Sequence, residues 1–180
     1  MGRLALSIFP DIHSNLCDNP TACLEVSSDR PGGGGIICDR WFGMPLAGLT
    51  DDQLNWLPPG SANKVGAVLI HAIAGEDLFI QQHLQGQPLL WDSQRWGETI
   101  GIPYPPSGPR GWDEARQATF RLADILPYQQ AVFTALTPAT LDGRLPFYGY
   151  EFLRAQLLAM SLLHMAEQAV EFSAIKGLQP

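Results

Sequence analysis

Two histidines in separate apolar segments are the residues of this chain with the clearest capacity for chemistry. His71 lies midway along residues 62–84, and His164 lies in residues 148–176. Two imidazoles on facing helices, with one further donor, match the ligand set of a catalytic zinc-type site, which leaves a coordination position open for water or substrate. The spacing alone does not establish a metal site, because a buried histidine is more often an ordinary core residue that is hydrogen-bonded inside a helical protein.

Four polar side chains form one stripe on the second of these segments. They are three, four and three residues apart, which places them on one side of a helix: Ser161, His164, Gln168 and Glu171. Such a stripe in an otherwise apolar helix costs free energy unless its polar groups are satisfied. The face of the first segment that carries His71 also carries small residues, which leave room beside an imidazole: Ala67, Ala74 and Gly75.

Apolar periodicity and stop signals predict the helices that must position these residues. Thr50 caps a short turn, a Pro-Pro-Gly break follows, and a helix is predicted over residues 62–84 with Gly86 as its terminator. The last helix is predicted over residues 148–176, with Gly177 at its end. Because it has apolar residues on nearly every side, we expect it to be largely buried.

The region between these two helices is Pro-rich at first and helical afterwards. Residues 87–111 form a long connection that carries Trp91 and Trp96. Residues 112–126 are helical in character, and Pro127 either kinks this helix or sits in the first turn of the next one. With three or four helices and no convincing strand, the sequence predicts an all-α fold, a helix bundle with a long Pro-rich crossover.

The chain is predicted to consist of an irregular N-terminal arm and one helical domain. Residues 1–35 contain a run of four glycines and several prolines, and neither the helical nor the strand period persists there. The glycine run lacks the Gly-Lys-Ser/Thr of a phosphate-binding loop, which favours a flexible arm. Residues 36–180 are predicted to form the bundle domain, with a weak helical pattern over 36–48 at its start.

Composition and charge restrict the class of function. The 180 residues are 46% hydrophobic, enough for one sizeable core, and 18 acidic residues outnumber 11 basic ones. No run of Lys or Arg offers a surface for nucleic acid, and the apolar stretch near the N-terminus is too short for a signal peptide or a membrane span. Cys17, Cys23 and Cys38 show no metal-binding or redox spacing. We therefore expect a cytoplasmic protein with reduced thiols that binds neither nucleic acid nor membrane.

Two long stretches resemble the DinB/YfiT-like family. The first, LTDDQLNWLPPGSANKVGAVLIHAIAGEDLFI, resembles the family segment in which Leu-Thr-acidic-x-x-Leu-x-x-x-Pro leads into a helix with a metal-binding His and, five residues later, a Glu. The second, LLHMAEQAVEFSAIKGLQ, is similar to the family's closing helix, usually His, three residues, His, then Gly-Glu-Ile and a terminal Lys-Gly-Leu. The resemblance covers about residues 46–179.

The resemblance implies a fold, a set of site residues and a class of activity. His71 stands at the first metal ligand, His164 at the second, and Gln168 where the third His normally stands. Glu76 matches the acidic residue after the first ligand, and Glu171 the one after the last. Family members are four-helix bundles with an unusual connection order, often bind a divalent metal ion, often form homodimers, and include thiol-dependent transferases and isomerases. We accordingly expect a homodimer that acts on a small-molecule substrate, such as a thiol.

Gln168 is the main departure from the family pattern. An amide oxygen is a weaker and harder donor than an imidazole, so affinity for zinc or nickel should fall, the preference should move toward manganese or magnesium, or the site could hold no metal. In one hypothesis, His71, His164 and Gln168 hold a zinc, nickel or manganese ion that lowers the pKa of a thiol or water in a thiol-dependent S-transferase or hydrolase. In the other, the chain is a degenerate, non-catalytic bundle that binds a small ligand or associates as a dimer.

Several further residues have two interpretations. Glu167 or Glu171 could orient an imidazole, although a solvated carboxylate is the commoner case. Four aromatic residues could line a substrate pocket or cover the core: Trp91, Trp96, Tyr104 and Trp112. His13 and His83 are predicted to be exposed and without function.

Overall fold

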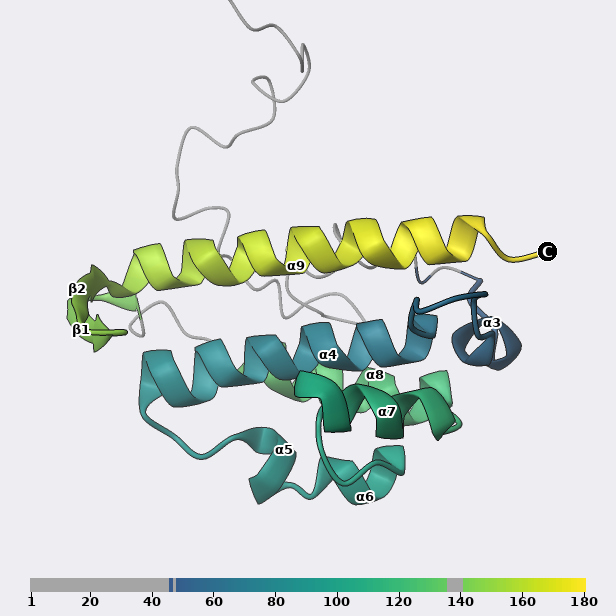
Figure 1. Cartoon of the computed structure of the whole chain (residues 1–180). Coiled ribbons are helices and arrows are strands. Elements are labelled where there is room, and N and C mark those ends of the chain that lie inside the picture. The colour runs from purple at the N-terminus through teal and green to yellow at the C-terminus, as the bar shows by residue number, and fades with distance from the viewer. Residues whose placement is uncertain (1–45, 47, 136–140) are drawn as a thin grey trace, which may run out of the picture.

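The computed structural model describes residues 46, 48–135 and 141–180, and this part of the chain is mostly helical with one small sheet (Figure 1). The elements follow in the order α3 (Asp51–Asn55), α4 (Val65–Asp77), η3 (Leu78–Leu84), α5 (Leu90–Ser93), α6 (Trp96–Ile100), α7 (Gly108–Gln117), α8 (Leu122–Thr134), β1 (Arg144–Phe147), β2 (Tyr150–Leu153) and α9 (Arg154–Gly177). The predicted arm of residues 1–35, the three cysteines and nearly all of the pattern at 36–48 lie outside the described residues.

Helices α4 and α9 lie side by side and run in opposite directions (Figure 1). α4 continues directly into the π-helical segment η3, so the helix predicted over residues 62–84 is confirmed, with its start at Val65. α9 spans 24 residues and ends at Gly177, also as predicted. Because α8 and α7 pack on other sides of α4, this helix is the central element of the described fold.

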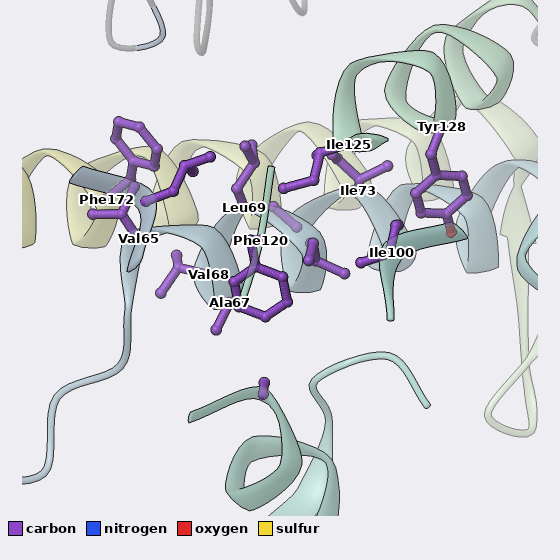
Figure 2. Close-up of a cluster of buried hydrophobic side chains, with 14 of the residues drawn as sticks. Val65, Ala67, Val68, Leu69, Ile73, Ile100, Phe120, Ile125, Tyr128 and Phe172 are labelled. Atoms are coloured by element: carbon purple, nitrogen blue, oxygen red, sulfur yellow. The ribbon is translucent and has the colours of Figure 1, made fainter. Parts of the chain in front are cut away.

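The main core surrounds α4, whose apolar residues between Val65 and Ile73 are fully buried. These side chains meet large apolar partners from the segments that surround the helix: Phe120, Ile125, Tyr128 and Phe172 (Figure 2). Each fully buried side chain of this kind contributes about 1.5–3 kcal/mol relative to the exposed state. The packing therefore fixes the rotation of α4 and α9 about their axes, and with it the polar residues that lie between them.

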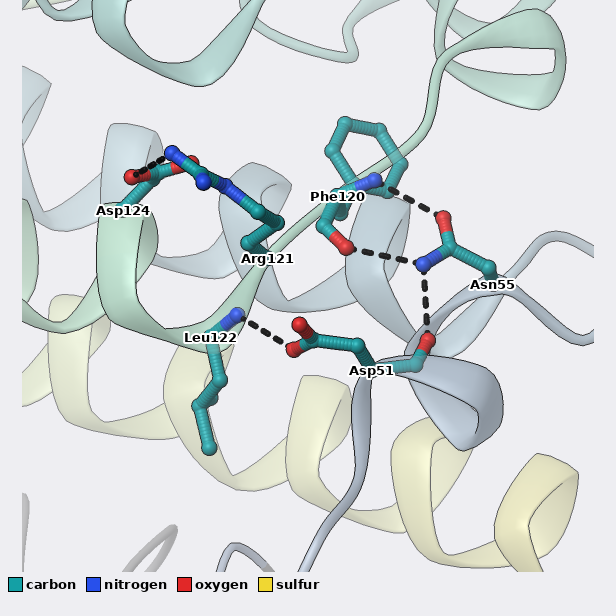
Figure 3. A network of polar contacts seen from close by, with 6 residues as sticks. All are labelled: Asp51, Asn55, Phe120, Arg121, Leu122 and Asp124. Atoms are coloured by element: carbon teal, nitrogen blue, oxygen red, sulfur yellow. Dashed lines mark hydrogen bonds and ion pairs between the residues drawn. The ribbon is translucent and has the colours of Figure 1, made fainter.

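The chain leaves the helical conformation between α7 and α8, and α3 holds this break. The side-chain amide of Asn55 donates to the carbonyl of Phe120 at 2.8 Å and accepts from its N–H at 2.8 Å, while the N–H of Leu122 donates to the Asp51 carboxylate at 2.9 Å (Figure 3). The prediction of one helix over residues 112–126 is therefore wrong. Side chains distant in the sequence satisfy the backbone groups at the break, which makes it stable.

Pro127 does not begin a new helix. It lies inside α8, beyond its first turn, five residues after the helix starts at Leu122. A proline at such a position lacks the N–H that the helical pattern requires and tends to kink the helix. Of the two interpretations of Pro127, the structure therefore excludes the first-turn position.

A β-hairpin precedes α9, contrary to the prediction that the chain has no strands. Its two antiparallel strands are joined by Tyr148 and Gly149, whose φ angles of 48° and 79° suit a two-residue hairpin turn. Leu145 and Phe147 are buried against the end of the α4–α9 pair, in a second apolar cluster. Consequently α9 begins at Arg154 and not near residue 148.

The Pro-rich crossover contains α5 and α6, two short helices that the sequence analysis did not predict. The carboxylate of Asp77, at the end of α4, accepts hydrogen bonds from the N–H groups of Leu90 and Trp91 at 3.0 and 2.8 Å and from the Tyr128 hydroxyl at 2.9 Å. The rings of Trp91 and Trp96 pack against Tyr128. The crossover thus covers one side of the core.

No helix within the described ranges is both long enough and apolar enough to cross a membrane.

Candidate metal centre

His71 on α4 and His164 on α9 meet between the two helices. Their Nε2 atoms are 3.4 Å apart, and their ring planes are inclined at 76°. Two nitrogen ligands at about 2.0–2.1 Å from one tetrahedral ion would be separated by about 3.3 Å. The pair therefore has the separation of two ligands that share a metal ion.

The other nitrogen of His71 is held by the crossover. Nδ1 lies 2.6 Å from the carbonyl oxygen of Pro106, which can only accept, so Nδ1 carries the proton and Nε2 has a free lone pair. The ring of Trp112 on α7 packs on the imidazole, with 4.9 Å between centroids. Burial lowers the pKa of His71, and the neighbouring His164 lowers it further, while the Pro106 hydrogen bond acts in the opposite direction. The net effect is a lowered pKa, which favours the neutral imidazole, the form that binds metal.

His164 is held from the α4 side by Gly75 and Glu76. A Cβ atom at position 75 would lie 2.5 Å from the His164 Cε1 atom, so only glycine leaves room for the ring. The Ser161 hydroxyl donates to Oε2 of Glu76, and Oε1 of Glu76 lies 3.8 Å from Nδ1 of His164. Burial raises the pKa of Glu76, and its interactions with His164 and with the Ser161 hydroxyl oppose this rise.

Gln168 lies one helical turn beyond His164 on α9. Its side-chain oxygen Oε1 is buried and has no hydrogen-bond partner among the described residues. The same residues contain no group of three or more His, Cys, Asp or Glu side chains that could hold a metal ion. With Gln168 as the third ligand, a centre at this place would have two imidazole nitrogens and an amide oxygen, a donor set that fits a divalent ion with further positions open.

The remaining predicted residues divide between the site and the surface. Glu167 and Glu171 are exposed, so the polar stripe on α9 reaches solvent after Gln168. The stripe becomes exposed there because the buried face of α9 is centred on Met165 and Phe172, and Glu171 lies at the edge of that face, next to solvent. Neither glutamate contributes to the histidine pair.

His83 is not exposed, contrary to prediction. It lies on η3 and is half-buried, with its ring 4.9 Å from that of Phe147 in the hairpin and close to that of Phe79. Burial lowers its pKa. His83 thus belongs to the aromatic cluster beside the hairpin, at some distance along the helix from His71. His13 lies outside the described residues.

The four aromatic residues of the crossover and α7 have separate roles. Trp91 and Trp96 cover Tyr128, Trp112 packs on His71, and Tyr104 is exposed with the Arg110 guanidinium over its ring. An open cavity of about 630 Å³ lies on α5 and α6, and its lining includes Trp91, Asp92 and Arg95. His71 and His164 do not line this cavity.

Glu76 and Ser161 are the site residues whose relationship the sequence analysis missed. Periodicity places Ser161 on the stripe of His164, and the family resemblance implies an acidic residue at Glu76, but neither indicates that the two side chains meet. A signal was available, because Glu76 is a carboxylate within a mostly apolar helix, and such a group needs a polar partner. Which partner it finds depends on the rotation of α9.

Comparisons with known proteins bear on the fold. No family model matches the chain, and no curated protein sequence matches it. The crystal structure of a conserved protein from Enterococcus faecalis is similar, with a TM-score of 0.62 and 17% sequence identity over 78% of this chain and 91% of that one. At this identity the similarity concerns the fold alone.

Proposed function

We propose that this chain is a DinB/YfiT-like metal-dependent enzyme in which His71 and His164 bind a divalent ion and Gln168 completes or orients the shell. The observation that carries the proposal is the 3.4 Å separation of the two Nε2 atoms. It is supported by the buried, unpartnered oxygen of Gln168 one turn away. The long antiparallel pair α4 and α9, with α8 and α7 beside it, is consistent with a four-helix bundle of this family.

The proposed reaction is thiol-dependent S-transfer or hydrolysis of a small molecule. A divalent ion, when bound, lowers the pKa of a coordinated thiol or water and so supplies a nucleophile near neutral pH. The chain's own residues provide the shape of the site: Pro106 orients His71, and Trp112 shields its ring from water on one side. The side chain of His164 is 23% exposed, which leaves an approach for substrate from solvent.

A non-catalytic bundle is the second candidate. It is favoured because the described residues contain no group of three or more His, Cys, Asp or Glu side chains arranged to hold a metal ion. The cavity on α5 and α6 would then be the place to look for a small ligand. Under this alternative the two histidines are a partly buried polar contact between helices, and the protein carries no stoichiometric metal.

Metal titration of tag-free apoprotein separates the two. We expect zinc, nickel or manganese to bind with a stoichiometry of one and an affinity well below millimolar, and we expect His71→Ala to abolish this binding. His83→Ala is the matched control, because His83 is a half-buried histidine on the same helical segment that lies away from the pair. Binding no tighter than about millimolar for all three ions would overturn the enzyme proposal.

A further inference from the structure

Glu76 is buried beside His164 with half of its carboxyl group unsatisfied. The residue is 1% exposed and lies at the interface of α4 and α9. Its Oε2 atom accepts the Ser161 hydroxyl, but Oε1 has no hydrogen-bond partner among the described residues, and neither has Nδ1 of His164. An unsatisfied polar atom at such a buried position is costly, so a carboxyl group retained there calls for a role.

The two unsatisfied atoms face one another. Oε1 of Glu76 lies 3.8 Å from Nδ1 of His164, about one ångström beyond a hydrogen bond, so a small rotation of either side chain would join them. On the side of Gly75 the ring lies close to α4, because a Cβ atom at that position would be only 2.5 Å from its Cε1 atom. On its far side, the Nε2 atom of His164 faces Nε2 of His71.

We propose that Glu76 is the positioning residue for His164: its carboxylate accepts the Nδ1 proton and so holds the imidazole in the tautomer whose Nε2 lone pair faces His71. Ser161 fixes the carboxylate from its other oxygen. The carbonyl of Pro106 has the equivalent role for His71. Carboxylate and carbonyl partners of this kind orient metal-binding histidines and fix their tautomer. The role in metal binding rests on the proposed function; the tautomer does not.

The test compares the wild type with Glu76→Gln in two measurements. The first is ¹⁵N NMR of the imidazole nitrogens in metal-free protein, and the second is titration with Co²⁺ followed by its visible absorption. We expect wild-type His164 to carry its proton on Nδ1 and Glu76→Gln to populate the Nε2-protonated form. Cobalt affinity should fall about 10–100-fold in this variant, as for other partners of metal-binding histidines.

Asp77→Asn is the matched control, because Asp77 is the next residue on α4, is equally buried and bonds elsewhere, to Leu90, Trp91 and Tyr128. This variant should lose stability while it keeps the tautomer of His164 and the cobalt affinity. Ser161→Ala provides a second variant should Glu76→Gln fail to fold. Ser161→Ala removes the hydrogen bond to the Glu76 carboxylate. It should change the His164 tautomer and the cobalt affinity in the same direction as Glu76→Gln, to a smaller extent.

The outcomes distinguish this inference from the proposed function. A proton on Nε2 of His164 in the metal-free wild type, as when Glu76 donates its own proton to Nδ1, overturns the inference, and so does a Glu76→Gln variant with unchanged tautomer and cobalt affinity. A wild type that shows the Nδ1 proton, loses it on Glu76→Gln and yet binds no cobalt overturns the metal site, while the positioning of His164 by Glu76 stands.

Discussion

The Nε2 atoms of His71 and His164 lie 3.4 Å apart, although 93 residues separate the two histidines in the sequence. A strong hydrogen bond between the rings would bring these atoms to about 2.9 Å, whereas two ligands of one tetrahedral ion are about 3.3 Å apart. The observed separation is closer to the second case. His71 has a partner for its Nδ1 atom in Pro106, and His164 has a carboxylate near its own.

Removal of His164 should abolish metal binding without unfolding the chain. We expect purified His164→Ala to carry no stoichiometric metal and to retain its helical circular dichroism. Its free energy of unfolding in the metal-free form should fall by about 1–3 kcal/mol, because the variant leaves a cavity and the buried Glu76 without a neighbour. Elemental analysis and urea titration measure the two effects. Unchanged metal content together with the stability loss would instead support the non-catalytic bundle.

Enlargement of Gly75 should displace His164. In Gly75→Ala the added methyl group would lie 2.5 Å from Cε1 of the ring, so the imidazole must move or the helices must separate. We expect a cost of about 1–3 kcal/mol in stability, as for other overpacked sites, and weaker binding of zinc or cobalt.

Gly177→Ala is the control for this substitution. A Cβ atom there would meet no atom within 4 Å, and the position is helical. The free energy of unfolding of Gly177→Ala should therefore equal that of the wild type or rise slightly. Calorimetric unfolding and metal titration of both variants provide the comparison. Equal metal affinity in Gly75→Ala and the wild type would contradict the close packing of His164 on α4.

Stability should fall at alkaline pH because of Tyr128. Burial raises the pKa of its hydroxyl, and the neighbouring Asp77 raises it further. The unfolded chain loses this proton near pH 10 while the folded chain keeps it, so the unfolded state binds fewer protons and the free energy of unfolding decreases as pH rises above about 10, by up to about 1.4 kcal/mol per pH unit. Urea titrations at pH 8 and pH 11 measure the decrease.

Tyr128→Phe should remove this contribution. The variant loses the hydrogen bond to Asp77 and is therefore less stable than the wild type near neutral pH, but the difference between the two proteins should shrink as pH rises past 10. Other tyrosines and lysines titrate equally in both proteins and cancel in the comparison. A constant difference across this range would show that Tyr128 titrates as it does in the unfolded chain.

Asn55 should stabilise the junction of α7 and α8. In Asn55→Ala the N–H and the carbonyl of Phe120 both lose their side-chain partner, so we expect a loss of about 1–3 kcal/mol. Asn63→Ala replaces an asparagine for which the structure has no such clamp and should change stability little. Urea titration measures the stability of both variants. An Asn55→Ala variant as stable as the Asn63→Ala control would show that the break between the helices holds without Asn55.

Helix existence and several boundaries could be predicted from the sequence because their causes are local. The apolar run around His71 predicts α4, the Thr50 cap predicts a turn where the short helix α3 begins, and Gly177 marks the end of α9. Where distant residues intervene, the predictions fail. The break after α7 depends on Asn55 and Asp51, and the hairpin before α9 depends on the burial of Leu145 and Phe147.

For the candidate site, the sequence by itself determined which residues share a helical face: His164 with Ser161 and Gln168, and His71 with small neighbours. Only the tertiary structure decided that the face of His71 turns toward that of His164, that Gly75 receives the ring, and that Ser161 meets Glu76. The physical reason is that periodicity specifies directions about one helix axis, whereas the rotation of one helix against another is set by packing of the whole core.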